Sequence, residues 1–76
     1  MLVKIIHKGD FIIMDFSLKE IRYLTPKDLI FIPLSNNDIE GYRNLLEVDK
    51  KLFLSCLKDD LLKEDIIVNL KDLEII

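Results

Sequence analysis

The sequence predicts an α+β domain with a mainly antiparallel small sheet, two helices and at least one C-terminal strand. Residues 1–34 hold four short apolar segments separated by turn-forming residues, residues 36–62 show helix caps and helical spacing, and residues 65–76 return to branched aliphatic residues. Strands grouped ahead of helices are typical of this fold class. The 76 residues suffice for a single small domain.

The first two strands are predicted at Met1–His7 and Phe11–Phe16. Lys8-Gly9-Asp10 lies between them and contains turn-forming residues. Gly9 suits the positive φ of a tight hairpin turn. We therefore expect the two strands to pair as a hairpin.

The third and fourth strands are predicted at Glu20–Thr25 and Leu29–Pro33. Partial alternation of apolar and polar residues indicates the former, and branched or aromatic residues favour extended backbone in the latter. Pro26 begins the turn between them. Pro33 lacks a backbone donor, so it should end its strand or lie on a sheet edge.

Two helices are predicted next. Asn36 or Asn37 is expected to cap a helix over Asp38–Leu46, and Asp49 is expected to cap a second helix over Lys50–Leu62. Helical spacing gives the second helix one buried stripe. That stripe comprises Phe53, Cys56, Leu57 and Leu61.

The segment after residue 63 fits two structures. Ile66, Leu70 and Leu73 have helical spacing, whereas Ile66-Ile67-Val68 is rich in strand-forming residues. The branched residues favour a strand here. Leu73–Ile76 is a candidate for a second C-terminal strand.

The charge of the chain disfavours nucleic acid as a partner. The formal net charge is −3 and the pI is near 5.0, with residues 1–46 neutral and all the excess acid in residues 47–76. Binders of DNA or RNA draw much of their affinity from basic residues that neutralise phosphates. We therefore expect no direct contact with DNA or RNA.

Catalytic, cofactor and metal sites are not predicted. His7 and Cys56 are the only histidine and cysteine, which is too few for a zinc site, and the two glycines cannot form a phosphate-binding loop. We expect His7 to be exposed at a strand end and Cys56 to be buried on a helix face. The acidic residues are interpreted as solvated faces and caps; they include Asp10, Asp15, Asp59, Asp60, Glu64 and Asp65.

The six aromatic residues are predicted to pack in the core. A base-stacking platform would need a basic groove beside it, and the sequence contains none. The six are Phe11, Phe16, Tyr23, Phe31, Tyr42 and Phe53.

The region Val3–Asp49 resembles the small β-rich B domain of the GINS DNA-replication complex. The resemblance lies in a first strand, an aromatic after an acid, an Ile-Pro strand end and a short helix with a basic residue before two leucines. The matching residues are Val3–Ile6, Asp10-Phe11, Tyr23-Leu24, Asp28, Ile32-Pro33 and Arg43–Val48. The chain departs from the family at Ser17–Glu20, where a glycine-rich turn is missing, and Asp49–Ile76 is too short for the family's helical A domain.

The resemblance implies a replisome scaffold: a protein–protein interaction module without enzymatic activity. Small size, acidity and the lack of a site motif also suit an alternative, a small acidic regulator or inhibitor of viral or mobile-element type that binds a host protein. A small hydrolase or nucleotide-handling subunit is disfavoured, because no nucleophile–base pair is recognisable.

A protein partner, or a second copy of the chain, is expected to bind the second predicted helix. Leu52, Leu54 and Leu62 project away from the centre of its buried stripe. Alternatively, Ile66–Ile76 folds over these leucines and buries them. A single cysteine fits a reducing cytoplasm, and no apolar run is long enough to span a membrane.

Overall fold

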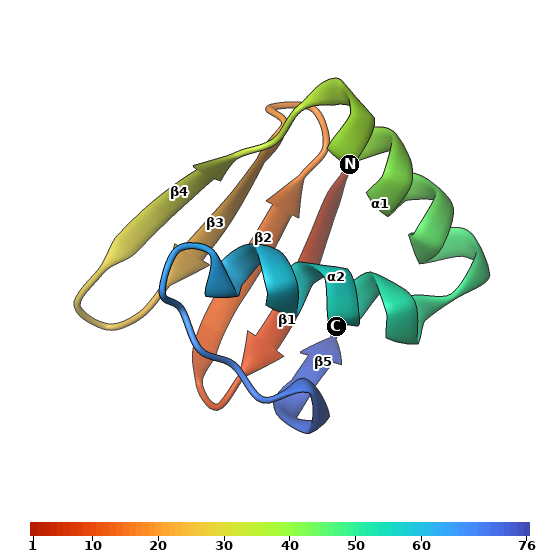
Figure 1. Ribbon diagram of the computed structural model, residues 1–76. Coiled ribbons are helices and arrows are strands. Elements are labelled where there is room, and N and C mark those ends of the chain that lie inside the picture. The colour runs from red at the N-terminus through yellow and green to blue at the C-terminus, as the bar shows by residue number, and fades with distance from the viewer.

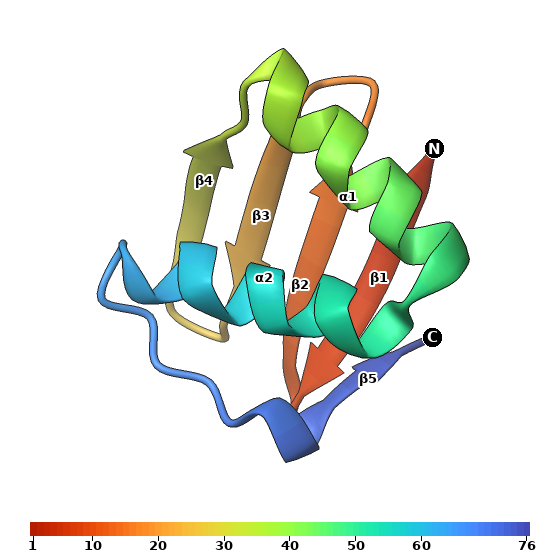
Figure 2. The ribbon, with the colours of Figure 1, turned by 45° about the vertical axis from the view of Figure 1, so that its right-hand side comes forward.

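The computed structural model describes all of residues 1–76 and confirms the α+β prediction. Five antiparallel strands form one sheet in the order β4-β3-β2-β1-β5, and two helices lie together on one of its faces (Figures 1 and 2). The strands are β1 (Leu2–His7), β2 (Asp10–Asp15), β3 (Glu20–Leu24), β4 (Leu29–Pro33) and β5 (Leu73–Ile75). The helices are α1 (Asn36–Val48), α2 (Lys50–Leu62) and the short 3₁₀ helix η1 (Leu70–Asp72).

The hairpin between β1 and β2 turns at Gly9 as predicted, but Asp10 belongs to β2 and not to the turn. His7 pairs with Asp10, so only Lys8 and Gly9 connect the strands. Both have positive φ, 49° and 86°. This is the tight turn whose twist matches that of the flanking strands, and glycine tolerates it at little cost.

The core lies between the sheet and the two helices. Phe53, Leu57 and Leu61 line the buried side of α2 and are fully inaccessible to solvent. They face the inward-pointing residues of the central strands, which alternate with outward-pointing ones. The fully buried strand residues are Ile5, Ile12, Met14 and Ile21.

The caps of the helices differ partly from the prediction. Ser35, rather than Asn36 or Asn37, caps α1, because its hydroxyl accepts from the Asp38 backbone N–H while the Asp38 carboxylate accepts from the Ser35 N–H. This reciprocal capping box satisfies two backbone donors at once. Asp49 caps α2 as predicted, with its carboxylate accepting from the Leu52 N–H at 3.0 Å.

The C-terminal segment forms one strand instead of two. Ile66 and Val68 are buried and alternate with exposed neighbours, as in a strand, but they pair with no other strand. The free edge of β1 is taken by β5, through pairs such as Ile5 with Ile75. The prediction of a strand at Ile66–Val68 was therefore wrong, because alternation reports burial of one side and not the presence of a hydrogen-bonding neighbour.

Neither principal helix has both the length and the apolar composition that crossing a bilayer requires.

Candidate functional site

The face of the sheet opposite the helices is uncovered and largely apolar. Strand alternation places every second residue on this side, and both helices lie on the other (Figure 2). We define the sheet-face patch as the six apolar residues that point outward near one end of the sheet. They are Ile6, Phe11, Ile13, Leu24, Leu29 and Phe31.

Four of these residues form a row across four strands. Ile6 pairs with Phe11, Phe11 with Leu24, and Leu24 with Leu29. Directly opposed side chains in a sheet are about 5 Å apart, so the row is continuous. Phe11 is 45% exposed and Leu29 is 52% exposed.

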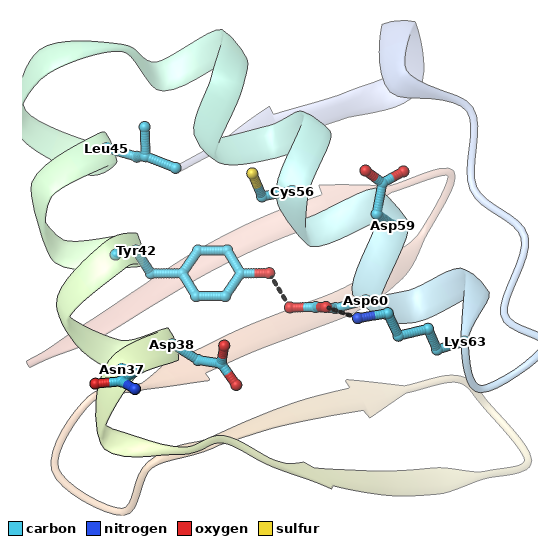
Figure 3. Close-up of a pocket in the computed structure, with 9 residues that line it drawn as sticks. Asn37, Asp38, Tyr42, Leu45, Cys56, Asp59, Asp60 and Lys63 are labelled. Carbon is cyan, nitrogen blue, oxygen red and sulfur yellow. Dashed lines mark hydrogen bonds and ion pairs between the residues drawn. The ribbon is translucent and has the colours of Figure 1, made fainter.

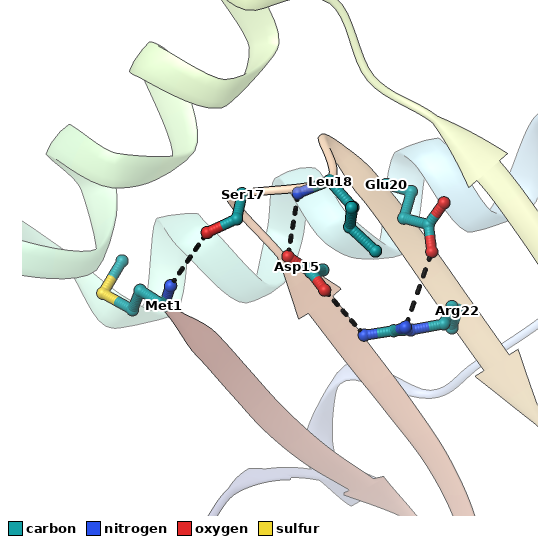
Figure 4. A network of polar contacts seen from close by, with 6 residues as sticks. All are labelled: Met1, Asp15, Ser17, Leu18, Glu20 and Arg22. Carbon is teal, nitrogen blue, oxygen red and sulfur yellow. Dashed lines mark hydrogen bonds and ion pairs between the residues drawn. The ribbon is translucent and has the colours of Figure 1, made fainter.

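The other end of this face carries a polar network. Asp15 accepts from the Leu18 backbone N–H at 2.9 Å and from Arg22 at 2.8 Å, and Arg22 also contacts Glu20 at 3.6 Å (Figure 4). The bond from Leu18, together with the Arg22 charge, lowers the pKa of Asp15. Asp15 is buried, which corrects its interpretation as a solvated carboxylate. The network neutralises this end of the face and leaves the apolar end as its most distinctive part.

The two exposed phenylalanines correct the prediction for the aromatic residues. Phe16, Tyr23, Tyr42 and Phe53 are buried in the core, as expected. Phe11 and Phe31 instead lie on the sheet-face patch, and Phe31 is 55% exposed. The period of two separates Phe11 from Ile12, but both are apolar, so only the position of the helices shows that Phe11 is on the open side.

A groove of about 320 Å³ lies between α1 and α2. The Tyr42 hydroxyl of α1 donates to the Asp60 carboxylate of α2, which also contacts Lys63 at 3.3 Å (Figure 3). Burial, followed by the bond to Asp60, raises the pKa of Tyr42. The Cys56 thiol and the carboxylates of Asp38 and Asp59 also line the groove. Cys56 is half-buried at the edge of the buried stripe of α2, which corrects the prediction that it is buried. These contacts join the two helices and provide no nucleophile–base pair.

No cluster of three or more His, Cys, Asp or Glu side chains has the arrangement of a metal site.

His7 is buried instead of exposed, so the prediction for this residue was wrong. Only 8% of it is accessible, and its Nε2 accepts from the Asn69 backbone N–H at 3.3 Å. An accepting Nε2 places the ring proton on Nδ1, which has no partner. His7 therefore holds the C-terminal segment against β1, a contact that joins residues 62 positions apart.

The leucines predicted to bind a partner occupy two environments. Leu52 and Leu62 are 47% and 52% exposed. Leu54 is half-buried against the core and lies in a depression that it shares with Leu70 and Leu73. The C-terminal segment thus adjoins Leu54, while the other two leucines stay accessible on α2.

Tyr23 and Tyr42 should resist ionisation until the protein unfolds. The Tyr23 hydroxyl donates to Asp10 at 2.8 Å, and burial with this bond raises its pKa to about 12. A raised tyrosine pKa stabilises the folded state below the unfolded value of 10.0, and this stability is lost as the pH rises from there towards 12. We expect tyrosinate absorbance and the circular dichroism signal to change together.

The variants Tyr23→Phe and Tyr42→Phe assign the two ionisations, because each retains one tyrosine. Ionisation near the ordinary value while the circular dichroism signal stays native would contradict the burial and hydrogen bonding of that residue.

The fold and the uncovered sheet face together define a small α+β domain in which the helices cover one face of the sheet. The chain matches no protein-family model, no curated protein and no solved structure at a significant level. The resemblance to the GINS B domain therefore stays a prediction based on the residues that suggested it.

Proposed function

We propose that the chain is a non-enzymatic protein-binding module whose sheet-face patch docks on an apolar surface of a protein partner. The observation that supports this is the continuous row Ile6–Phe11–Leu24–Leu29 on a face that no helix covers. Contiguous apolar patches on soluble proteins commonly mark interaction sites. Burial of a large apolar side chain contributes about 1.5–3 kcal/mol, so a few of these residues can anchor a complex.

The charge of the chain supports a protein rather than a polyanionic partner. The net charge is −3, and anionic lipid surfaces and nucleic acids attract basic patches. On the sheet face, the Arg22 guanidinium is already paired with Asp15 and Glu20, which leaves Lys4 as a single cation and not a basic patch. An apolar protein surface with few charges would complement the patch best.

The narrower form of this proposal is a replisome scaffold, as the GINS resemblance implies, and the alternative is a regulator that binds a host protein. Both require a docking surface and no reaction. Identifying the captured protein distinguishes them: a replication protein supports the scaffold, and any other host protein supports the regulator.

Replacing Phe11 by lysine should abolish binding of the partner while the fold persists. The Phe11 side chain points away from the core, so lysine is tolerated there, but its charge would be buried in the complex at high cost. We expect the affinity to fall by at least about tenfold, as for truncation of an interface anchor. The measurement is capture from lysate of the native cell, identification of the protein, and titration of the purified partner.

The matched control is Leu62→Lys, which adds the same charge at a similarly exposed position on α2. Binding that is lost with Phe11→Lys and retained with Leu62→Lys supports the sheet-face patch. The reverse pattern would move the interface to the helix surface of Leu52 and Leu62. If no captured protein responds to either variant, the proposed function is wrong.

A further inference from the structure

The two edges of the sheet differ in how well they are protected against pairing with a strand of another chain. At one edge, β5 has three residues and includes Glu74. At the other, β4 has five residues, and no charged residue lies between Asp28 and Asp38. Natural sheets usually block a free edge with charges, proline or short strands, because an open edge pairs with other chains. Of these, the β4 edge has only Pro33, at its last residue.

The hydrogen bonds of β3 and β4 show which backbone groups of β4 are free. The Thr25 N–H donates to the Asp28 carbonyl at 2.9 Å, and the Leu34 N–H donates to the Lys19 carbonyl at 2.8 Å. Antiparallel ladders alternate bonded and non-bonded pairs, so even-numbered residues of β4 face β3. The backbone groups of Leu29, Phe31 and Pro33 therefore point to the open edge.

Pro33 fits this alternation. Proline has no N–H and is tolerated in a sheet only where a donor is not needed. Its carbonyl, together with the N–H and carbonyl groups of Leu29 and Phe31, remains available on the outer side of β4. The open edge thus offers two donors and three acceptors.

We propose that β4 pairs antiparallel with β4 of a second copy of this chain, around a two-fold axis at Phe31. Each Phe31 N–H then donates to the Phe31 carbonyl of the other copy, and each Leu29 N–H donates to the Pro33 carbonyl of the other copy. All the open donors on both edges are satisfied. The two sheets become one continuous sheet across the dimer.

The side chains of β4 are compatible with this symmetric register. With Phe31 opposite its symmetry mate, the five residues of one strand overlap all five of the other. Ile30, which is 36% exposed at the edge of the helix side, lies opposite Ile32 of the second copy. Neither copy of β4 carries a charged residue, so no like charges are opposed in the dimer. A different strand with charged residues would find no counter-ion on β4.

The self-pairing uses the outer backbone groups of β4, whereas the proposed function uses outward side chains of the sheet, so it goes beyond the proposed function even though Leu29 and Phe31 belong to both surfaces. A five-residue edge buries less than the roughly 800 Å² per partner of a standard interface. We therefore expect a weak, reversible dimer. Failure of the dimer to form would leave the Phe11-dependent binding test unaffected.

Sedimentation equilibrium combined with amide hydrogen exchange tests the dimer on the unmodified protein. We expect a monomer–dimer equilibrium, with the Leu29 and Phe31 amides exchanging slowly at high protein concentration and rapidly at low concentration. A monomer at all concentrations would overturn the proposal. A dimer in which these two amides still exchange rapidly would overturn it as well, because its interface would lie elsewhere.

Two variants separate the contribution of the Phe31 backbone N–H to dimerisation from that of the Phe31 side chain. Phe31→Pro removes the outward N–H without breaking a bond to β3, and Phe31→Ala removes the ring alone. We expect the proline variant to dimerise at least about tenfold more weakly than the alanine variant, since two bonds are lost per dimer. Equal dimerisation of the two folded variants would contradict the pairing. If the proline variant does not fold, hydrogen exchange in the unmodified protein decides.

Discussion

Replacing Phe53 by alanine should unfold most of the protein at room temperature. The Phe53 ring is fully buried and packs edge-on against Tyr42, with ring centroids 5.3 Å apart and planes at 73°. Truncating a buried phenylalanine costs about 3–5 kcal/mol, and the aromatic pair adds about 0.5–1.5 kcal/mol. A domain of this size has only a few kcal/mol of stability in total.

The adjacent residue of α2 provides the control. Leu52 is 47% exposed, so Leu52→Ala should change the free energy of unfolding by no more than about 0.5 kcal/mol. Urea denaturation monitored by circular dichroism measures both variants. A Phe53→Ala protein with a cooperative transition near that of the unmodified protein would show that α2 does not anchor the core.

The elements with local determinants could be predicted from the sequence. The bounds of α2 match the prediction, because Asp49 supplies a cap and the spacing of Phe53, Leu57 and Leu61 defines one buried stripe. The hairpin of β1 and β2 was predicted equally well from Gly9. Such features depend on neighbours within a few residues, which is the range that periodicity and capping describe.

Features that depend on distant contacts could not be predicted. The burial of His7 requires Asn69 to lie beside it, and the pairing of β5 with β1 joins the two ends of the chain. Because the competing strand candidate at residues 66–68 is equally rich in branched aliphatic residues, local propensity could not decide which segment takes the free edge of β1.

The candidate site also depends on contacts between distant parts of the chain and could not be predicted from local patterns. Helical spacing predicts that the exposed large apolar residues are Leu52, Leu54 and Leu62 on α2. The structure places the larger continuous exposed group on the sheet face, through Phe11 and Phe31. Strands that are apolar on both sides do not reveal which side is covered, so only the placement of the helices identifies the open face.

The groove between the helices provides the second large effect, because a polar bond across it joins α1 to α2. The Tyr42 hydroxyl donates to the Asp60 carboxylate across the groove (Figure 3). Tyr42 is buried, and its ring also contacts Phe53. Removing the hydroxyl alone therefore leaves the aromatic packing in place and tests the bond.

Tyr42→Phe should lower the free energy of unfolding by about 1.5–3 kcal/mol, the contribution of a hydrogen bond to a charged group. The matched control is Tyr23→Phe, which removes a hydroxyl bonded to Asp10 and should cost less, because Tyr23 is 9% exposed and Tyr42 only 4%. A double-mutant cycle of Tyr42→Phe with Asp60→Ala measures the coupling directly. Coupling near zero would mean that apolar packing alone joins the helices. Substantial coupling would show that the hydrogen bond between Tyr42 and Asp60 stabilises their packing.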